Sequence, residues 1–479
     1  MIKNFFKTSS IYFGATIAEK VIALIFFSYL AHILSIEDMG KYSIYLIFYT
    51  ILSFLLSLEI KSGFGRFYFE HKDDNRKNFE LTILNSSILI NILMIIPVYI
   101  SYNLFNNFIP IDKDIFNILL ILTIFDSLIY LFLFKARYDK KDLHYVILTL
   151  LKPILLVSSF FILNIYIENE IFLIFLSMLI SSSILVVLFF VVNYIKVYKF
   201  YINFHMLKQS LTFSIWLVPS SIGSYFSNFT DKVMIEKMIN TSSVGIYSVF
   251  QKISTLVVTA IEPLYNVIMP KVMENYKNDN FKQEYYLYIN IILFVLLIIN
   301  LFIAIFAKDI VVLLGGDKYI EYYKFIYLFL VLNIFIFIPK FLALNIHLSK
   351  QSKYVTAVEV ISGILNILVN IVFITHFGLI GAIYATLITY FIRLVMYDYF
   401  AKKLFDKFHI KYSYYLSYIS FSIFLFYCTY LIQENIDLLY KVPIYIILIL
   451  FVIIYFYYSS SYDTRCKILN KIRGIYNAR

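Results

Sequence analysis

Residues 171–192 read IFLIFLSMLISSSILVVLFFVV, an apolar stretch without a single charged side chain. A helix of about 20 such residues is long enough to cross a bilayer. Similar runs fill most of the 479-residue chain, of which 61% is hydrophobic and only 15% is charged. Strands of a membrane barrel are about 10 residues long and alternate in polarity, so these runs do not fit a barrel. The sequence therefore predicts an all-α polytopic membrane protein.

The apolar runs divide into about fourteen predicted transmembrane helices. The polar stretch 66–80 separates two of them clearly, whereas only a short polar turn at 240–245 separates two of the longest. The predicted ranges are 10–34, 42–65, 82–102, 115–135, 144–166, 170–194, 210–238, 242–269, 285–307, 322–345, 354–375, 379–401, 412–431 and 442–459.

The basic residues are distributed unevenly between the two sides of the predicted membrane. Of the 41 Lys and Arg residues, 27 fall in the termini and loops of one side and 7 in the loops of the other. Cytoplasmic loops are enriched in basic residues, so we expect both termini in the cytoplasm. The same short loops account for the net charge of +11, which therefore does not indicate nucleic-acid binding. Cys428 and Cys466 suggest neither a disulfide framework nor a metal site.

A short internal repeat predicts a two-lobe arrangement. Residues 39–44 read MGKYSI and residues 244–249 read VGIYSV, and each hexamer leads into a predicted helix. Transporters are often built from repeats around a central site. We expect two six-helix lobes, followed by two further helices and a basic cytoplasmic tail. The corresponding ranges are 1–200, 201–408 and 409–479.

Polar side chains recur on one face of several predicted helices. Intervals of three and four residues place side chains on one helical face, and lipid does not solvate such a face. We expect these faces to meet one another or water, although hydroxyl groups alone also hold helices together. The stripes are Tyr12, Thr16, Glu19 and Lys20; Thr50, Ser53, Ser57 and Lys61; Ser220, Ser224, Asn228 and Asp231; Ser248, Lys252, Thr255, Thr259 and Glu262; and Glu359, Ser362, Asn366 and Asn370.

Charged side chains inside the predicted helices are candidates for function, because a charge near the bilayer centre costs from about 2.5 to more than 10 kcal/mol. The basic ones are Lys20, Lys61, Lys152, Lys232, Lys252, Lys340 and Arg393, and the acidic ones are Glu19, Glu59, Asp126, Asp231, Glu262 and Glu359. We interpret Lys252 and the pair Asp231–Lys232 as functional. Asp126 has no obvious partner. Some of these residues lie near the cytoplasmic ends of their helices, where snorkelling to the membrane surface is as good an explanation as function. They are Lys61, Lys152, Lys340 and Glu359.

Signatures of catalysis are absent from the sequence. Gly315-Gly316-Asp317 is a short outer turn rather than a phosphate-binding loop, and His347 and His376 are isolated. No polar segment is long enough for an ATPase domain. We expect a protein that is not an enzyme and has no cofactor, driven by an ion gradient or by the gradient of its substrate.

Five stretches resemble a known family. Its members show a Pro near the start of the seventh helix, an Asp followed by a basic residue, and a Val-Gly-Ile-Tyr-Ser motif leading to a Lys. The stretches here are 217–221 (LVPSS), 228–232 (NFTDK), 244–253 (VGIYSVFQKI), 34–43 (LSIEDMGKYS) and 378–386 (GLIGAIYAT). The chain thus resembles the polysaccharide flippases, which are the O-antigen and capsule repeat-unit translocases of the multidrug/oligosaccharidyl-lipid/polysaccharide (MOP) exporter superfamily.

This resemblance implies an architecture and a cargo. It implies lobes arranged in a V, with alternating access to a cavity lined by the helices at 10–34, 42–65, 210–238 and 242–269. The implied cargo is an undecaprenyl-pyrophosphate-linked oligosaccharide, whose phosphates pair well with Lys and Arg in a low-dielectric site. The substrate-binding candidates are Lys20, Lys61, Lys232, Lys252 and Arg393.

A related branch, the lipid II flippases, has a sodium site in the second lobe, which this chain resembles at Asp231, Asn366, Asn370, Ala382 and Thr386. Hard oxygen ligands suit a hard cation. Asn370 stands where an acid would strengthen the site, so a proton on Asp231 is an alternative to sodium. The expected ion-coupling residues are Glu19, Asp231, Glu262, Asn366, Asn370 and Thr386.

The sequence is thus read as a flippase of the bacterial inner membrane for lipid-linked repeat units of O-antigen (lipopolysaccharide), capsule or another polysaccharide. Its expected partners are membrane lipids, a polysaccharide polymerase and a chain-length regulator. Three alternatives remain open: a cation-coupled antiporter of the multidrug type, a lipid II flippase, and a non-transporting scaffold of a polysaccharide assembly complex.

Overall fold

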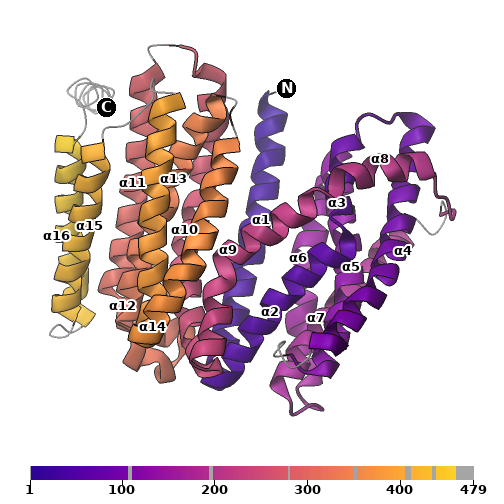
Figure 1. Ribbon diagram of the computed structural model, residues 1–479, viewed down its shortest axis with the longest axis horizontal. Coiled ribbons are helices and arrows are strands. Elements are labelled where there is room, and N and C mark those ends of the chain that lie inside the picture. The colour runs from indigo at the N-terminus through magenta and orange to yellow at the C-terminus, as the bar shows by residue number, and fades with distance from the viewer. Residues whose placement is uncertain are drawn as a thin grey trace. The chain divides into compact units, whose positions relative to one another are not determined.

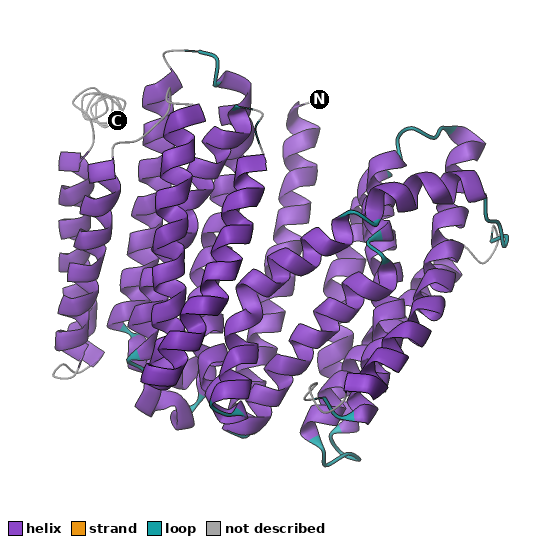
Figure 2. Cartoon of the chain, viewed as in Figure 1, coloured by secondary structure: helices purple, strands orange, loops and turns teal. Residues whose placement is uncertain are grey.

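A computed structural model describes residues 2–105, 111–193, 198–278, 281–349, 351, 353–404, 412–433 and 438–459. Almost all of these residues are helical, and they contain no strand (Figure 2). The expected all-α fold is therefore confirmed. The chain separates into two compact units, Met1–Phe229 (unit 1) and Thr230–Arg479 (unit 2). The expected division at residues 200 and 408 stays a prediction.

The helices follow one another with short connections. Unit 1 holds α1 (Ile2–Ile33), α2 (Ile36–Ser57), α3 (Ile60–Phe67), α4 (Asp73–Phe105), α5 (Lys113–Tyr138), α6 (Asp142–Leu163), α7 (Glu170–Asn193), α8 (Phe204–Ser214) and the start of α9 (Leu217–Met238). Unit 2 holds the end of α9, α10 (Thr241–Asn275), α11 (Phe281–Ile305), α12 (Ala307–Gly315), the 3₁₀-helix η1 (Asp317–Tyr322), α13 (Phe325–Leu348), α14 (Lys353–Leu404), α15 (Tyr412–Gln433) and α16 (Leu438–Ser459).

Twelve helices among the described residues are long and apolar enough to cross a membrane. One of them, α14, has 52 residues and is kinked at Gly378. At about 1.5 Å per residue its length is more than twice that of an apolar core of about 30 Å. Its two halves match the separate helices predicted at 354–375 and 379–401. If the two halves of α14 are counted separately and α9 is added to the twelve, the structure agrees with the expected number of about fourteen helices.

Two predicted helices are interrupted. The range 42–65 divides into α2 and α3 because Leu58 and Glu59 adopt left-handed φ angles of 44° and 54°. The buried Glu59 carboxylate is held beside this break by a hydrogen bond from Ser62 (3.2 Å). The range 210–238 divides into α8 and α9, and Pro219 then falls in the first turn of α9, where a missing N–H is tolerated. An unbroken helix was the wrong prediction at both places.

The repeated hexamers lie at the same position in α2 and α10. Ser35 caps α2 by accepting from the backbone N–H of Asp38 (3.0 Å). Asn240 caps α10 by accepting from the N–H of Ser243 (2.8 Å). Each cap stands four residues before its hexamer, at Met39 and at Val244. The repeat therefore marks two helices that begin in the same way.

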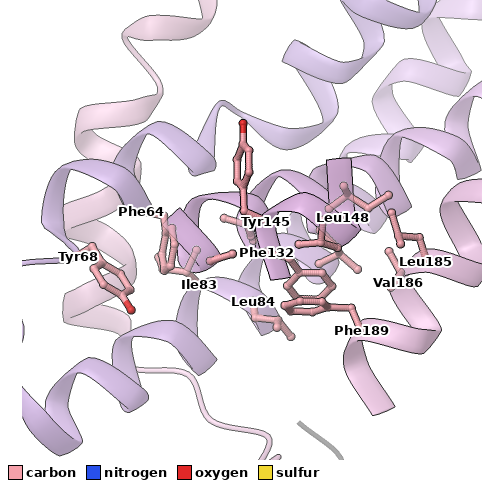
Figure 3. Packing of buried hydrophobic residues seen from close by; sticks show 14 of the residues in the cluster. Phe64, Tyr68, Ile83, Leu84, Phe132, Tyr145, Leu148, Leu185, Val186 and Phe189 are labelled. Carbon is pink, nitrogen blue, oxygen red and sulfur yellow. The ribbon is translucent and has the colours of Figure 1, made fainter. Parts of the chain in front are cut away.

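A cluster of aliphatic and aromatic side chains lies in the core of unit 1 (Figure 3). Phe132 of α5 stacks on Phe189 of α7 with ring centroids 4.5 Å apart. Phe64 of α3 stacks on Phe79 of α4 at 5.8 Å. Rings of this size bury a large apolar area and dominate core energetics. The cluster thereby fixes the helices that carry the charged side chains of this unit.

Helix α8 is fastened to unit 1 by polar contacts. The N–H of Gly63 donates to Ser214 Oγ at 2.9 Å, and a Cβ at Gly63 would lie only 2.6 Å from that oxygen. The residue before α8, Asn203, donates its N–H to Thr82 Oγ1 at 3.1 Å. The start of α9 is thus held by the same unit.

The last two helices, α15 and α16, run beside α11 in unit 2 (Figure 1). Tyr418 of α15 donates to the carbonyl of Leu293 (2.9 Å), and Tyr445 of α16 donates to that of Ile298 (3.2 Å). The basic tail predicted after α16, including Cys466, lies outside the described residues.

Candidate functional site

Asp231 lies near the end of α9 and is buried, with only 4% of its surface exposed. The short connection capped by Asn240 turns the chain into α10. This turn places Tyr247 of α10 against Asp231, and its hydroxyl donates to Asp231 Oδ2 at 2.9 Å. The sequence motif contained Tyr247 but gave it no role, because hydrogen bonding across a turn leaves no periodic signal within one helix.

The two halves of α14 bring further donors to the same carboxylate. Asn370 Nδ2 donates to Asp231 Oδ1 at 2.7 Å, and Thr386 Oγ1 donates to Oδ2 at 2.8 Å. Asn370 Nδ2 also donates to Asn366 Oδ1 at 3.1 Å, and Thr386 Oγ1 lies 3.0 Å from the carbonyl oxygen of Ala382. The five residues predicted from the resemblance therefore meet in one buried cluster, called the Asp231 cluster below.

Two glycines allow both halves of α14 to approach the Asp231 carboxylate. Gly378, between the two halves of α14, has a φ of 58° and a ψ of −137°, a backbone conformation that residues with a Cβ avoid. At Gly381 a Cβ would lie 2.0 Å from the carbonyl oxygen of Phe373. The kink turns the chain back on itself, so that Asn370 and Thr386 reach the same carboxylate from the two halves.

The Asp231 cluster has the donor set of a hard-cation site. It offers carboxylate, amide, hydroxyl and backbone oxygens, which are the ligands of sodium-like ions. Asn370 Oδ1 is buried and accepts no hydrogen bond from the described residues, and a buried oxygen of this kind calls for a partner. The cluster therefore fits a small cation or a proton. The described residues contain no group of three or more His, Cys, Asp or Glu that could hold a metal ion.

Two lysines are linked electrostatically to the Asp231 cluster, Lys232 directly and Lys252 through Lys232. Lys232 is buried, with 8% of its surface exposed, and interacts electrostatically with both Asp231 and Lys252. Lys252 is exposed on α10, as is Thr255 on the next turn, whereas Phe250 and Ile253 are buried. The polar stripe predicted along α10 is therefore exposed or partly exposed from Lys252 to Glu262, whereas Ser248, its first member, is buried.

Unit 1 contains a buried aspartate of the same kind, Asp126 of α5, with 2% of its surface exposed. Lys152 Nζ of α6 lies 2.6 Å from Asp126 Oδ1, and Ser182 Oγ of α7 donates to the same oxygen at 2.7 Å. The hydroxyl of Tyr49 of α2 donates to Oδ2. The interpretation that Asp126 has no obvious partner was wrong, because its partners are on other helices. These four residues are called the Asp126 cluster below.

Several other predicted site residues form ion pairs. Lys61 Nζ lies 3.6 Å from Glu59, and Lys340 Nζ lies 2.8 Å from Glu262. Arg393 lies 3.5 Å from Glu359. Two substrate-binding candidates, Lys61 and Arg393, and one ion-coupling candidate, Glu262, thus form ion pairs within their own units.

The remaining candidates lie on α1 or outside the described side chains. Glu19 is half-buried and interacts electrostatically with Lys20 and Lys152, and Lys20 is exposed. Glu19 therefore belongs to the surroundings of the Asp126 cluster. The side chains of Ser220, Ser224 and Asn228, predicted to continue the stripe on α9, lie outside the described residues.

The sequence pattern of a family described as polysaccharide biosynthesis protein matches residues 29–324. A curated relative from Haloferax volcanii, the probable low-salt glycan biosynthesis flippase Agl15, is 26% identical over 206 residues. That match covers 41% of this chain and 43% of the relative, so it spans less than half of either protein.

Solved structures share the fold. The lipid II flippase MurJ in an inward closed conformation superimposes with a TM-score of 0.73 and 17% identity, over 93% of this chain and 98% of that chain. An inward-facing multidrug resistance MATE family transporter of the MOP superfamily gives a TM-score of 0.63 and 13% identity, over 81% and 95% of the two chains. At these identities the likeness concerns the fold alone.

Proposed function

The chain belongs to the polysaccharide biosynthesis protein family, and we propose that it is a flippase for lipid-linked oligosaccharides. The proposed cargo is an undecaprenyl-pyrophosphate-linked repeat unit, carried across the bacterial inner membrane by alternating access. The family, the glycan-flippase relative, the candidate spans and the MurJ-like fold support a multi-pass, flippase-like transporter. The relatives are transporters, in agreement with the expectation of a protein that is not an enzyme.

The observation that carries the proposal is the charge arrangement around Asp231. The hydrogen bonds to this buried carboxylate come from neutral groups, and the adjacent Lys232 interacts with both Asp231 and Lys252. A pyrophosphate group is strongly anionic and pairs with lysine. A carboxylate that accepts its hydrogen bonds from neutral groups also attracts a proton or a sodium ion, and either one lowers the cost of its burial. One region of unit 2 thus combines chemistry for an anionic cargo with chemistry for a coupling cation.

The proposal is tested by replacing Lys252 with Ala. If Lys252 pairs with the anionic cargo, loss of one charge-assisted hydrogen bond of about 1.5–3 kcal/mol lowers transport by about ten- to a hundredfold. The measurement is surface polysaccharide in a deletion strain that carries the variant, normalised to its abundance in the membrane. Lys252→Arg is the matched control, because it retains the positive charge and should retain most activity. Unchanged polysaccharide at normal Lys252→Ala abundance contradicts the proposed role.

The same experiment separates the alternatives. A non-transporting scaffold tolerates substitutions along the exposed face of α10, including Lys252→Ala and Thr255→Ala. A multidrug-type antiporter changes the resistance of the strain to cationic drugs and leaves its polysaccharide unchanged. A lipid II flippase supports growth of cells depleted of their own lipid II flippase.

A further inference from the structure

Tyr130 of α5 is an aromatic side chain among charged groups within a membrane span. It is 46% exposed, and Lys61 Nζ lies 4.7 Å from its ring centroid. It also interacts electrostatically with Lys152, Asp126 and Glu19. Lipid does not solvate such charges. The face of unit 1 around Tyr130 therefore meets water or a polar ligand rather than acyl chains, unlike most exposed aromatic rings of a membrane protein.

The charges on this face balance one another. Lys152 is paired with Asp126 at 2.6 Å and Lys61 with Glu59 at 3.6 Å, and the two carboxylates are 2% and 5% exposed. An anionic ligand would have to compete with these fixed carboxylates for the ammonium groups. A neutral ligand that both donates and accepts hydrogen bonds can join the pairs without separating them.

We infer that this face is a subsite for an uncharged sugar ring of the cargo, with its C–H face against Tyr130. A sugar ring has an apolar face and a rim of hydroxyl groups, which matches an aromatic ring bordered by groups of both charges. The hydroxyl groups accept from Lys61 and Lys152 and donate to Glu19. The ion pairs hold these side chains in place before binding, which lowers the entropic cost of ordering them.

The inference rests on the proposed function and assigns different parts of the cargo to different chemistry. The lysines linked to the Asp231 cluster suit the pyrophosphate. The balanced face around Tyr130 suits neutral sugar, such as a hexose or an N-acetylhexosamine, rather than a uronic or sialic acid.

The test is photocrosslinking with the cargo that cells make. Tyr130 is replaced by p-benzoylphenylalanine in a deletion strain, the cells are irradiated, and the adduct is identified by mass spectrometry. We expect an adduct with the intact cargo, and fragmentation should place the crosslink on a neutral sugar. The control is the same probe at Phe161 of α6, which is 47% exposed and contacts the rings of Tyr29 and Phe160, and there we expect acyl-chain adducts or none. An acidic sugar, or only lipid chains, at position 130 overturns the inference.

A second series covers the case in which the probe impairs the protein. Tyr130→Phe keeps the ring and should retain polysaccharide export within about twofold. Tyr130→Leu removes the ring and should lower export about three- to tenfold, since aromatic packing is worth about 0.5–1.5 kcal/mol. Equal export by both variants at equal abundance overturns the inference. If the deletion strain itself keeps its polysaccharide, the proposed function fails; if only the Tyr130 results are negative, only the subsite fails.

Discussion

The buried carboxylates Asp126 and Asp231 have nearly the same hydrogen-bond partners in different units. Each accepts from one tyrosine, one aliphatic hydroxyl and one nitrogen donor. At Asp126 the donors are Tyr49, Ser182 and Lys152; at Asp231 they are Tyr247, Thr386 and Asn370. The nitrogen is therefore the main difference, because it belongs to an ammonium group in unit 1 and to a neutral amide in unit 2.

This one difference changes what each carboxylate requires. The charge of Asp126 is compensated by Lys152 at 2.6 Å. Asn370, at 2.7 Å from Asp231, donates equally closely but brings no charge. A buried carboxylate without full compensation is costly, and binding a proton or a metal cation removes that cost. The Asp126 cluster is suited to holding helices together, and the Asp231 cluster is suited to exchanging an ion.

The similarity does not follow from the internal repeat. The hexamers align Tyr42 with Tyr247, whereas the tyrosine that meets Asp126 is Tyr49, two helical turns further along α2. Asp126 lies on α5 and Asp231 on α9. The two donor sets are thus assembled from positions that the repeat does not relate. Each must be explained by the local requirement of a buried carboxylate.

The largest effect is expected when the Asp231 cluster is given an ammonium donor like the one in the Asp126 cluster. In Asn370→Lys, the new ammonium group would occupy the place of the coupling cation. Transport should fall at least about 100-fold, because a coupling ion would have to separate a buried ion pair, and breaking such a pair costs about 3–5 kcal/mol. The measurements are cargo flipping in vesicles under an imposed sodium or proton gradient, and the melting temperature of the purified protein with and without sodium.

The control for this change is Asn370→Met, because a methionine side chain has a length similar to that of lysine but carries no charge. Both variants carry the cost of placing a longer side chain at a fully buried position, about 1–3 kcal/mol. Only the lysine variant should recover stability by pairing with Asp231. Ion-stimulated flipping by Asn370→Lys at wild-type level would show that the Asp231 cluster is not the coupling site.

The next largest effect is expected when the unit 1 pair is broken. Asp126→Leu leaves the Lys152 ammonium without its carboxylate. Breaking a buried pair costs about 3–5 kcal/mol, and because the Lys152 side chain is 29% exposed we expect about 2–4 kcal/mol. Unfolding in mixed micelles with increasing SDS measures this loss. The double variant Asp126→Leu with Lys152→Met should recover at least half of it. No recovery would show that the two side chains contribute independently.

Sequence alone located the helices because each needs a long apolar run, and the structure has a helix at every predicted range. The break at Leu58 and Glu59 could not be predicted in this way. Neither residue is Gly or Pro, and left-handed φ angles at such residues leave no local signal. The kink of α14 was easier to predict, because residue 378 is a glycine and glycine permits the backbone conformation of the kink.

The two clusters were predictable to different degrees. Asp231, Asn366, Asn370 and Thr386 were found through a resemblance, and the i, i+4 spacing of the two asparagines also places them on one helical face. Lys152 was assigned only an ambiguous role because its partner Asp126 lies 26 residues away on another helix. Pairing between neighbouring helices depends on their rotation and register, which the periodicity of one helix does not contain.

The smallest expected effects compare the hydroxyl donors of the two clusters. Ser182→Ala and Thr386→Val each remove one hydrogen bond to a carboxylate, at 2.7 and 2.8 Å. Each should cost about 1–2 kcal/mol of stability, since the carboxylate retains its other donors. Only Thr386→Val should also weaken ion binding, by about three- to tenfold, because its oxygen is a candidate ligand. The sodium dependence of the melting temperature measures that difference.

Matched controls lie close to both hydroxyl groups. Ser183 donates to the carbonyl of Ile180 at 2.9 Å, and Thr389 donates to that of Ala385 at 2.8 Å, so each bonds only within its own helix. Ser183→Ala and Thr389→Val remove the same atoms without touching a carboxylate, and their stability should change by less than about 0.5 kcal/mol. A shift in sodium dependence for Ser182→Ala as large as that for Thr386→Val would mean that both carboxylates respond to the ion, and the distinction drawn from Lys152 and Asn370 would fail.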